Sequence, residues 1–311
     1  MHNPFSYSSD NKRYHTLAYH NKATFGKKIF KAVIDAGFSC PNKDGTKGTG
    51  GCIFCDSGSG YFTASPETSV KKQFEDELRR IHLKNPDADA IAYFQANTNT
   101  YADVETLKKI YLPLVGHKNL AGISIGTRAD CLQNDILDFL QELSEKTYLT
   151  VELGMQTIHN KTLELINRGY DHQVFLKGYY ELKKRSIRTC IHIINGLPDE
   201  TAEMMLETAK ETGKLKPDAL KIQLLHIISG TPLEKLYRSG YFSEMSKEDY
   251  INITVRQLEY IPPETVIERI TGDGDKTKLI APLWSCDKIS VLGGIDKMQV
   301  QSDSWQGKKA N

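Results

Sequence analysis

Short apolar runs alternate with amphipathic helical segments along most of the chain, and this alternation limits the possible folds more than any other feature. Six apolar runs of strand length are each followed by a polar or glycine-containing turn and then a helical pattern. Such a repeat is typical of a parallel sheet, because parallel strands need a crossover connection that is usually a helix. The predicted strands are 29–37, 90–96, 120–125, 149–153, 189–194 and 219–225. These six units predict an α/β fold, a partial (β/α)6 barrel of the TIM type with parallel strands, and an open doubly wound sheet is the alternative.

Three cysteines lie within sixteen residues that follow the first predicted strand. Cys40 is separated from the Cys52-Ile-Phe-Cys55 step by a loop rich in glycine, which lets a backbone approach a bulky object closely. Structural zinc takes four ligands, and a four-iron cluster also has four corners. Three thiolates would therefore leave one iron open to another molecule. A zinc knuckle completed by Asp44 or Asp56, or a disulfide with one free thiol, are the alternatives.

This stretch resembles the cluster motif of the radical S-adenosylmethionine (SAM) superfamily, CxxxCxxC with an aromatic residue before the third cysteine. Phe54 is that aromatic residue, and eleven residues separate Cys40 from Cys52, a longer gap than the family's usual one. With this longer gap, the motif CPNKDGTKGTGGCIFC resembles that of the YhcC-like branch, which is related to the catalytic subunit of Elongator. The resemblance implies that Cys40, Cys52 and Cys55 are catalytic residues and the metal ligands of a [4Fe–4S] cluster. SAM would bind its open iron and be cleaved reductively to a 5′-deoxyadenosyl radical.

The resemblance also implies which residues bind SAM. The turn after the second strand, with Gln95 and Asn97, occupies the place of the motif that receives the SAM ammonium group. After the fourth strand, Gln156 and Arg168 match residues that hold the SAM ribose and carboxylate, and Glu152 is expected to face the same cavity. Two further segments resemble those that support the adenine, and their residues are Gly196, Leu197 and His226. The alternative for the turn with Gln95 and Asn97 is that it caps the following helix, and the alternative for His226 is an ordinary hydrogen-bonded histidine.

Candidate substrate residues are charged and follow predicted strands. Arg128 and Asp130 follow the third strand, where they would anchor substrate or form a local ion pair. Arg269 and Lys276 belong to a charged cluster near the C-terminus. The relationship to Elongator suggests that the substrate is a tRNA and that the reaction alters the C5 substituent of a wobble uridine. A small metabolite, a peptide, or a non-catalytic zinc or nucleic-acid-binding role are the alternatives.

Charge and cysteine content complete the prediction. The chain carries 40 basic and 39 acidic residues, but residues 1–55 hold eight basic and three acidic ones, so the N-terminal segment could contact phosphates. We predict a basic arm at 1–28, a barrel at 29–245 and a C-terminal extension at 246–311. No secretory or membrane segment is evident, so a cytoplasmic protein with a flavodoxin or ferredoxin as reducing partner is expected. Three scattered cysteines are too few for a second cluster: Cys131, Cys190 and Cys286.

Overall fold

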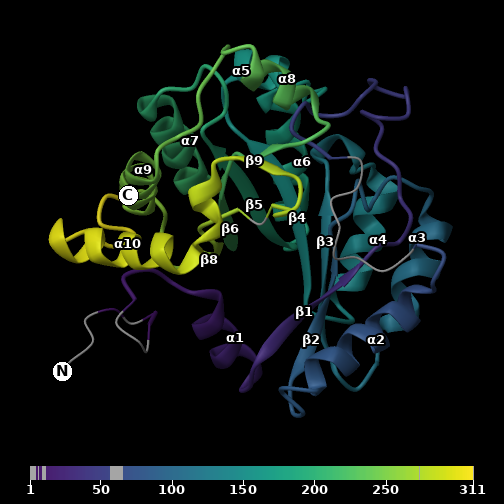
Figure 1. Ribbon diagram of the computed structural model, residues 1–311. Helices are drawn as coiled ribbons and strands as arrows, with labels where there is room; N and C mark the ends of the chain where they lie inside the picture. Colours follow the sequence, from purple (N-terminus) through teal and green to yellow (C-terminus); the bar gives the residue numbers. More distant parts are fainter. Residues whose placement is uncertain (1–4, 6, 9–11, 57–65, 273, 311) are drawn as a thin grey trace.

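The molecule is built on one parallel sheet, which the computed structural model shows curled into part of a barrel with helices around its outer face (Figure 1). The structure describes residues 5, 7–8, 12–56, 66–272 and 274–310. The sheet has seven strands in the order β1-β2-β3-β4-β5-β6-β8, all pairing in parallel. These strands are β1 Ile29–Ile34, β2 Asp89–Phe94, β3 Leu120–Thr127, β4 Leu149–Gln156, β5 Arg188–Asn195, β6 Ala219–Leu224 and β8 Val266–Arg269.

The strand order decides between the two predicted architectures. The strands β1 to β6 lie side by side in sequence order and β8 follows β6, so the winding never reverses direction. A doubly wound sheet needs such a reversal. The partial barrel is therefore confirmed, with β1 and β8 at its two edges.

Helices connect the strands and cover the convex face of the sheet (Figure 1). Most begin at a Ser, Thr or Asp whose side chain accepts a hydrogen bond from a backbone N–H of the first turn, as with Ser69 before α2 and Thr201 before α7. The helices are α1 Leu17–Phe25, α2 Val70–His82, α3 Val104–Tyr111, α4 Asn134–Ser144, α5 Asn160–Leu165, α6 His172–Lys184, α7 Ala202–Leu215, α8 Pro232–Arg238, α9 Lys247–Leu258 and α10 Lys288–Gln301. Short 3-10 turns are η1 Leu112–Leu114, η2 Ala129–Cys131 and η3 Leu283–Cys286.

The two terminal segments are more regular than the sequence suggested. Within the predicted basic arm at 1–28, residues 17–25 form α1, which is capped by Thr16 and contacts β8. The C-terminal segment supplies β8, which pairs with β6 and becomes the seventh strand. It also supplies β9 Leu279–Ala281, which pairs antiparallel with β7 Ile227–Ile228. At four residues, β8 is too short for a periodic signal in the sequence.

Side chains of the strands alternate between a dry outer layer and a polar interior. In β6, Leu220, Ile222 and Leu224 pack in the main hydrophobic core with the helices. Their neighbours Lys221 and Gln223 point to the opposite side, because successive strand residues face opposite sides of a sheet. The polar side is therefore enclosed by the curl of the sheet itself.

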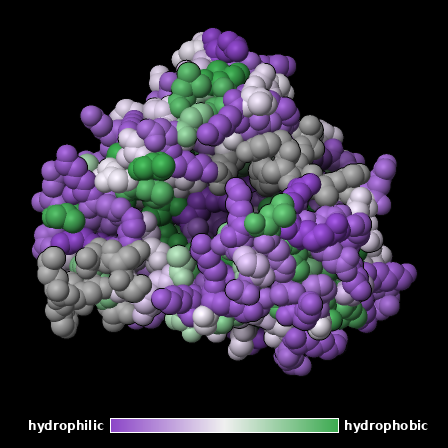
Figure 2. Space-filling model, turned by 60° about the horizontal axis from the view of Figure 1, so that its bottom comes forward, coloured by the Kyte–Doolittle hydropathy of each residue, from purple (hydrophilic) through white to green (hydrophobic). Residues whose placement is uncertain are grey.

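The surface drawn in Figure 2 is hollowed near its middle, and hydrophilic residues line the hollow. Hydrophobic residues on this face occur as separate patches between charged ones. Among the described residues, no helix combines the length and the apolar character needed to cross a membrane.

Candidate active site

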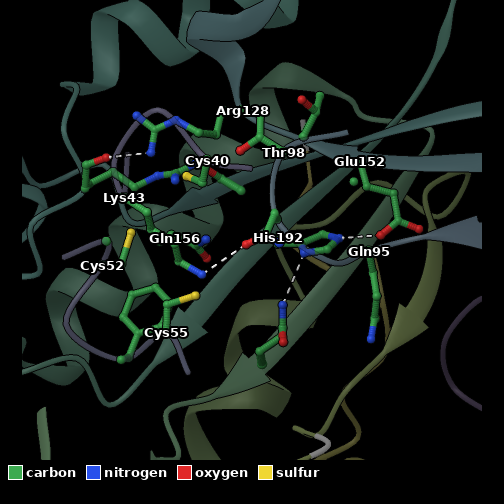
Figure 3. Close-up of a pocket in the computed structure, with 18 of the residues that line it drawn as sticks. Cys40, Lys43, Cys52, Cys55, Gln95, Thr98, Arg128, Glu152, Gln156 and His192 are labelled. Atoms are coloured by element: carbon green, nitrogen blue, oxygen red, sulfur yellow. Dashed lines mark hydrogen bonds and ion pairs between the residues drawn. The ribbon is translucent and has the colours of Figure 1, made fainter. Parts of the chain in front are cut away.

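A cavity of about 300 Å³ opens where the parallel strands end, and it contains most of the predicted site residues. One wall carries the three cysteines of the motif (Figure 3). The remaining walls come from the strand ends and, deeper in the barrel, from the strands themselves. The lining side chains at the strand ends include Gln95, Asn97, Thr98, Arg128 and Gln156, those within the strands are Tyr93, Glu152, His192, Gln223 and Arg269, and Arg168 reaches the cavity from the turn after α5.

The segment between Cys40 and Cys55, here called the cluster loop, is held in place by backbone hydrogen bonds. Its first turn closes where the Lys43 N–H donates to the Cys40 carbonyl at 2.8 Å. At its other end, the Ile53 N–H donates to the Ile166 carbonyl at 3.0 Å, and the Leu233 N–H donates to the Ile53 carbonyl at 2.9 Å. Ile53 and Phe54 also pack against a small hydrophobic cluster that contains Ile166 and Leu233. The second half of the motif is thereby held against two separate parts of the barrel.

The three thiols of the motif are unpaired and lie in the same cavity wall. Burial raises the pKa of the Cys55 thiol, and the nearby ammonium of Lys43 partly offsets this. The side-chain amide of Asn42 donates toward the Cys52 sulfur at 3.9 Å. A cation and an N–H donor next to the sulfurs favour thiolates and therefore binding of a metal cluster.

The donor set fits a cluster held at three corners. Within the described part of the chain, the cavity wall holds these three thiols and no fourth cysteine. Asp44, one proposed fourth zinc ligand, does not line the cavity, and Asp56 pairs with Lys278 at 2.8 Å. The described residues therefore provide no closed tetrahedral set of ligands.

Next to the cysteines, the β2 turn brings its amide side chains to the cavity. The Lys43 ammonium donates to the Asn97 Oδ1 at 3.0 Å, which connects this turn to the cluster loop. Asn97 has a left-handed backbone conformation, with a φ of 59°. Asparagine tolerates this conformation better than most residues. Gln95 also lines the cavity.

Gln156 and Arg168 lie close together at the end of β4, and both line the cavity. Arg168 donates to the Gly154 carbonyl at 2.7 Å, and its guanidinium stacks on the Tyr170 ring at 4.4 Å. The Gln156 Oε1 and the Arg168 Nε are buried and have no hydrogen-bond partner among the described residues. Buried polar atoms without partners are rare in proteins, so these two are suited to a polar ligand in the cavity.

The Arg128 guanidinium also lines the cavity, and it forms the ion pair that was one of its two predicted roles. Its Nε lies 2.9 Å from Asp130 Oδ1, and it donates to the Arg168 carbonyl at 3.0 Å. Lys47 of the cluster loop reaches the same carboxylate at 2.8 Å. Burial opposes ionisation of Asp130, but Arg128 and Lys47 outweigh it and lower the pKa of Asp130. Asp130 itself does not line the cavity.

The inner end of the cavity holds a network of buried charges, which we call the inner network. At its centre is the Glu152 carboxylate, whose side chain is fully buried. It accepts hydrogen bonds from Ser124 Oγ at 2.6 Å, from His192 Nε2 at 2.8 Å and from Lys221 Nζ. Further members are Tyr93, Lys31 and Glu268, with Lys31 and Glu268 paired at 2.8 Å.

The inner network balances its charges without a metal ion. Burial opposes the charged form of Glu152, but Lys221 and Lys31 outweigh it and hold the pKa of Glu152 well below its usual 4.5. Burial and the charge of Lys221 both lower the pKa of His192, so the imidazole is neutral. Potential ligand atoms of Glu152, Cys190 and His192 do lie within 4.8 Å of one another. Two ammonium groups already neutralise this region, which makes it unsuitable for a cation.

Five predicted site residues lie outside the cavity lining, namely Asp130, described above, and Gly196, Leu197, His226 and Lys276. Leu197 is in the small hydrophobic cluster that also packs on Phe54. His226 is packed against Gly272 and Gly274, where an added Cβ would come within 2.6 Å of its ring. Lys276 is exposed on the C-terminal segment. Arg269, by contrast, does line the cavity.

The sequence did not predict several residues that line the cavity, among them Lys43, Tyr93, His192 and Gln223, nor Lys221 of the inner network. The available signal was a polar residue at alternate positions of an otherwise apolar strand, as for His192 between Ile191 and Ile193. That signal identifies a side of the strand. It does not identify which other strands face it.

The sequence matches the models of one protein family and is similar to several of its members. The model of the Radical SAM superfamily matches residues 44–212, and the model of the Radical_SAM C-terminal domain matches residues 217–299. The Bacillus subtilis (strain 168) protein YtqA is 48% identical over 307 residues, which is 98% of this chain and 95% of YtqA. Protein YhcC of Escherichia coli K12 is 36% identical and spans 88% of both chains.

A more distant similarity extends to Elongator. Human Elongator complex protein 3 is 26% identical over 69% of this chain and 36% of its own length. Among solved structures, Methanocaldococcus infernus Elp3 with an N-terminal deletion superposes with a TM-score of 0.68. That match has 18% identity and covers 89% of this chain and 64% of the other, so the fold is shared.

Proposed function

Because the chain belongs to the radical SAM superfamily, whose enzymes use a [4Fe–4S] cluster and S-adenosylmethionine, we propose that it modifies the C5 substituent of a wobble uridine in tRNA. The observation that carries the enzymatic part is the single cavity that collects three thiols and the unpartnered polar atoms of Gln156 and Arg168. The tRNA part is supported by relatives, and it is tested separately below.

The cysteines would hold the cluster. Cys40, Cys52 and Cys55 supply three thiolates, while Asn42 and Lys43 offer an N–H donor and a positive charge beside them. With both bound, cluster and SAM supply one-electron cleavage chemistry that lets the enzyme take a hydrogen atom from an unreactive carbon. The protein's own task is to orient the bound molecules and to keep water out.

The remaining residues would orient SAM. The free Gln156 Oε1 would accept a hydrogen bond from a ribose hydroxyl, and the free Arg168 Nε–H would donate to a carboxylate. Gln95 and Asn97 would receive the ammonium group. Gly196, Leu197 and His226 would support the adenine from behind the lining, because their segments pack against the cavity wall without opening onto it.

The substrate assignment is supported by the named relatives. The tRNA uridine(34) acetyltransferase of Methanocaldococcus jannaschii is 29% identical over 51% of this chain and 29% of its own length. Its name specifies the wobble position of tRNA. The basic residues of the first 55 positions are compatible with binding a phosphate backbone. A flavodoxin or ferredoxin would supply the electron.

The decisive test is a comparison of tRNA nucleosides by mass spectrometry in a strain that lacks the gene. We expect one modified wobble uridine to be replaced by its precursor. The wild-type gene should restore the nucleoside, whereas a Cys52→Ala version, expressed to the same level, should not. An unchanged nucleoside profile in the deletion strain would contradict the tRNA assignment and leave a small metabolite or a peptide as substrate.

A further inference from the structure

The orientation of one amide side chain in the cavity is fixed by its neighbours, and part of its hydrogen-bonding capacity is unused. This residue is Gln223 of β6, whose Nε2 lies 3.2 Å from the His192 Nδ1. Gln223 lines the same cavity as the three cysteines and is only partly buried. Among the described residues, its amide makes no other hydrogen bond.

The inner network determines which end of this amide faces His192. The Glu152 carboxylate is an acceptor only, and Lys221 and Lys31 keep it ionised. The His192 Nε2, 2.8 Å from that carboxylate, must therefore carry the hydrogen (Figure 3). A neutral imidazole with hydrogen on Nε2 has a lone pair on Nδ1, so only the NH2 group of Gln223 can face it.

This arrangement leaves a defined edge of the amide toward the cavity. One N–H of Gln223 is used by His192. The second N–H and the Oε1 carbonyl of the planar amide make no hydrogen bond to the described residues and stay available to a ligand. The edge thus offers one donor and one acceptor in a fixed order, and rotating the amide to exchange them would point the carbonyl at the Nδ1 lone pair.

The imide edge of uracil is the complement of this arrangement. When the ribose and the C5 position of the base are held in place, uracil presents its O4 acceptor beside its N3–H donor, whereas cytosine presents an amino donor beside a ring-nitrogen acceptor at the same two positions. Proteins that act on a base commonly take it out of the stack and read its pairing edge in a pocket. Building on the proposed function, we infer that Gln223, oriented by His192 and Glu152, recognises the imide edge of the target uracil and rejects cytosine.

The experiment measures binding of synthetic anticodon stem-loop RNAs by fluorescence anisotropy. The enzyme holds its cluster and SAM, and no reductant is added. Three RNAs differ only at the wobble position, which is uridine, cytidine or N3-methyluridine. The wild-type enzyme should bind the uridine RNA about tenfold or more tightly than the other two, since a good two-bond contact with a base discriminates by that order.

Variants then assign the discrimination to the amide. Gln223→Met keeps a similar volume and should bring the three affinities together, mainly by weakening the uridine RNA. His192→Phe should reduce the difference between uridine and cytidine, because the amide is then free to turn over. Gln141→Met, on the exposed surface of α4, is the matched control and should keep the full preference. Melting temperatures show whether each variant is folded.

The outcomes separate the two levels of the proposal. If Gln223→Met keeps the wild-type preference, or if the wild-type enzyme binds all three RNAs equally, the role of Gln223 is refuted and the tRNA assignment is unaffected. If the wild-type enzyme binds none of the RNAs and the deletion strain has normal nucleosides, the proposed function itself is refuted.

Discussion

Asn42 and Asn167 connect the cluster loop to the end of α5 by hydrogen bonds that run in both directions. The Asn42 Nδ2 donates to the Asn167 carbonyl at 2.6 Å. The Asn167 Nδ2 donates in return to the Gly51 carbonyl at 2.8 Å and to the Thr49 carbonyl at 3.2 Å. Because Gly51 precedes Cys52, this pair positions the loop that carries the candidate ligands.

Substituting Asn167 should loosen the cluster loop. Two variants separate the loss of its side-chain hydrogen bonds from the effect of its backbone conformation. Asn167 has a left-handed backbone with a φ of 52°, which glycine adopts freely and alanine does not. Asn167→Gly removes only the side-chain bonds and should speed the loss of iron to a chelator. Asn167→Ala should in addition lower the free energy of unfolding by about 1 kcal/mol relative to Asn167→Gly. Asn134→Ala, at an exposed site, is the control; equal iron release from all variants would contradict the role of the pair.

Replacing any one of the three motif cysteines should abolish cluster binding. Cys40→Ala, Cys52→Ala and Cys55→Ala each leave only two thiolates in the cavity, so anaerobically purified protein should be colourless and lack iron and sulfide. Cys286→Ala alters an exposed cysteine outside the cavity and should leave the brown protein unchanged. Full iron content in Cys52→Ala would contradict the assignment, and one bound zinc in the wild-type protein would favour the knuckle instead.

Adding one methyl group at Gly154 should weaken SAM binding. A Cβ at this position would lie 2.5 Å from the Gln156 Nε2 and 3.2 Å from an Arg168 guanidinium nitrogen. Both side chains must then move away from the positions proposed to hold SAM. We expect Gly154→Ala to raise the Kd for SAM at least about tenfold, a cost near 1.4 kcal/mol, by isothermal titration calorimetry. Gly293→Ala in α10, where a Cβ meets nothing within 4 Å, should leave the Kd unchanged.

Breaking the central ion pair of the inner network should destabilise the fold. Glu152→Gln leaves the buried ammonium of Lys221 without its main counter-charge, which costs roughly 3 kcal/mol in comparable buried pairs. The double variant Glu152→Gln with Lys221→Met removes both charges and should recover part of that loss. Urea unfolding measures both, with the exposed Glu145→Gln as control. Additive effects of the two substitutions would show that the pair is not coupled.

His226 should make stability depend on pH in the mildly acidic range. Burial, and then the charges of Lys288 and Arg269, lower the pKa of His226 from 6.5 to about 4. The unfolded chain therefore takes up a proton at a higher pH than the folded one. The stabilisation from the neutral ring is complete above pH 6.5 and is lost as the pH falls toward 4.

The variant His226→Gln removes this titration and should flatten the dependence. The difference between wild type and variant across that range should approach roughly 3 kcal/mol at most. Urea unfolding at a series of pH values gives the two curves. Parallel curves would show that His226 is protonated alike in the folded and unfolded states.

The sequence by itself determined the features that depend on local spacing. Alternating apolar runs predicted the strands and helices, and the structure confirms the partial barrel. The cysteine spacing, with Phe54, led to the family. These features can be recognised in the sequence because the motif lies within sixteen neighbouring residues and the side chains of a strand alternate with a period of two.

Only the tertiary structure decided how the polar sides of the strands combine. Glu152 and Lys221 are 69 residues apart in sequence, and each appears alone as a polar residue in an apolar run. β8 carries Glu268 and Arg269, and it was not evident in the sequence because it has only four residues. The curl of the sheet brings β1, β4, β5, β6 and β8 around one interior, where water is excluded and each charge must find a partner. That closure, a property of the whole sheet, creates the inner network and fixes the orientation of Gln223.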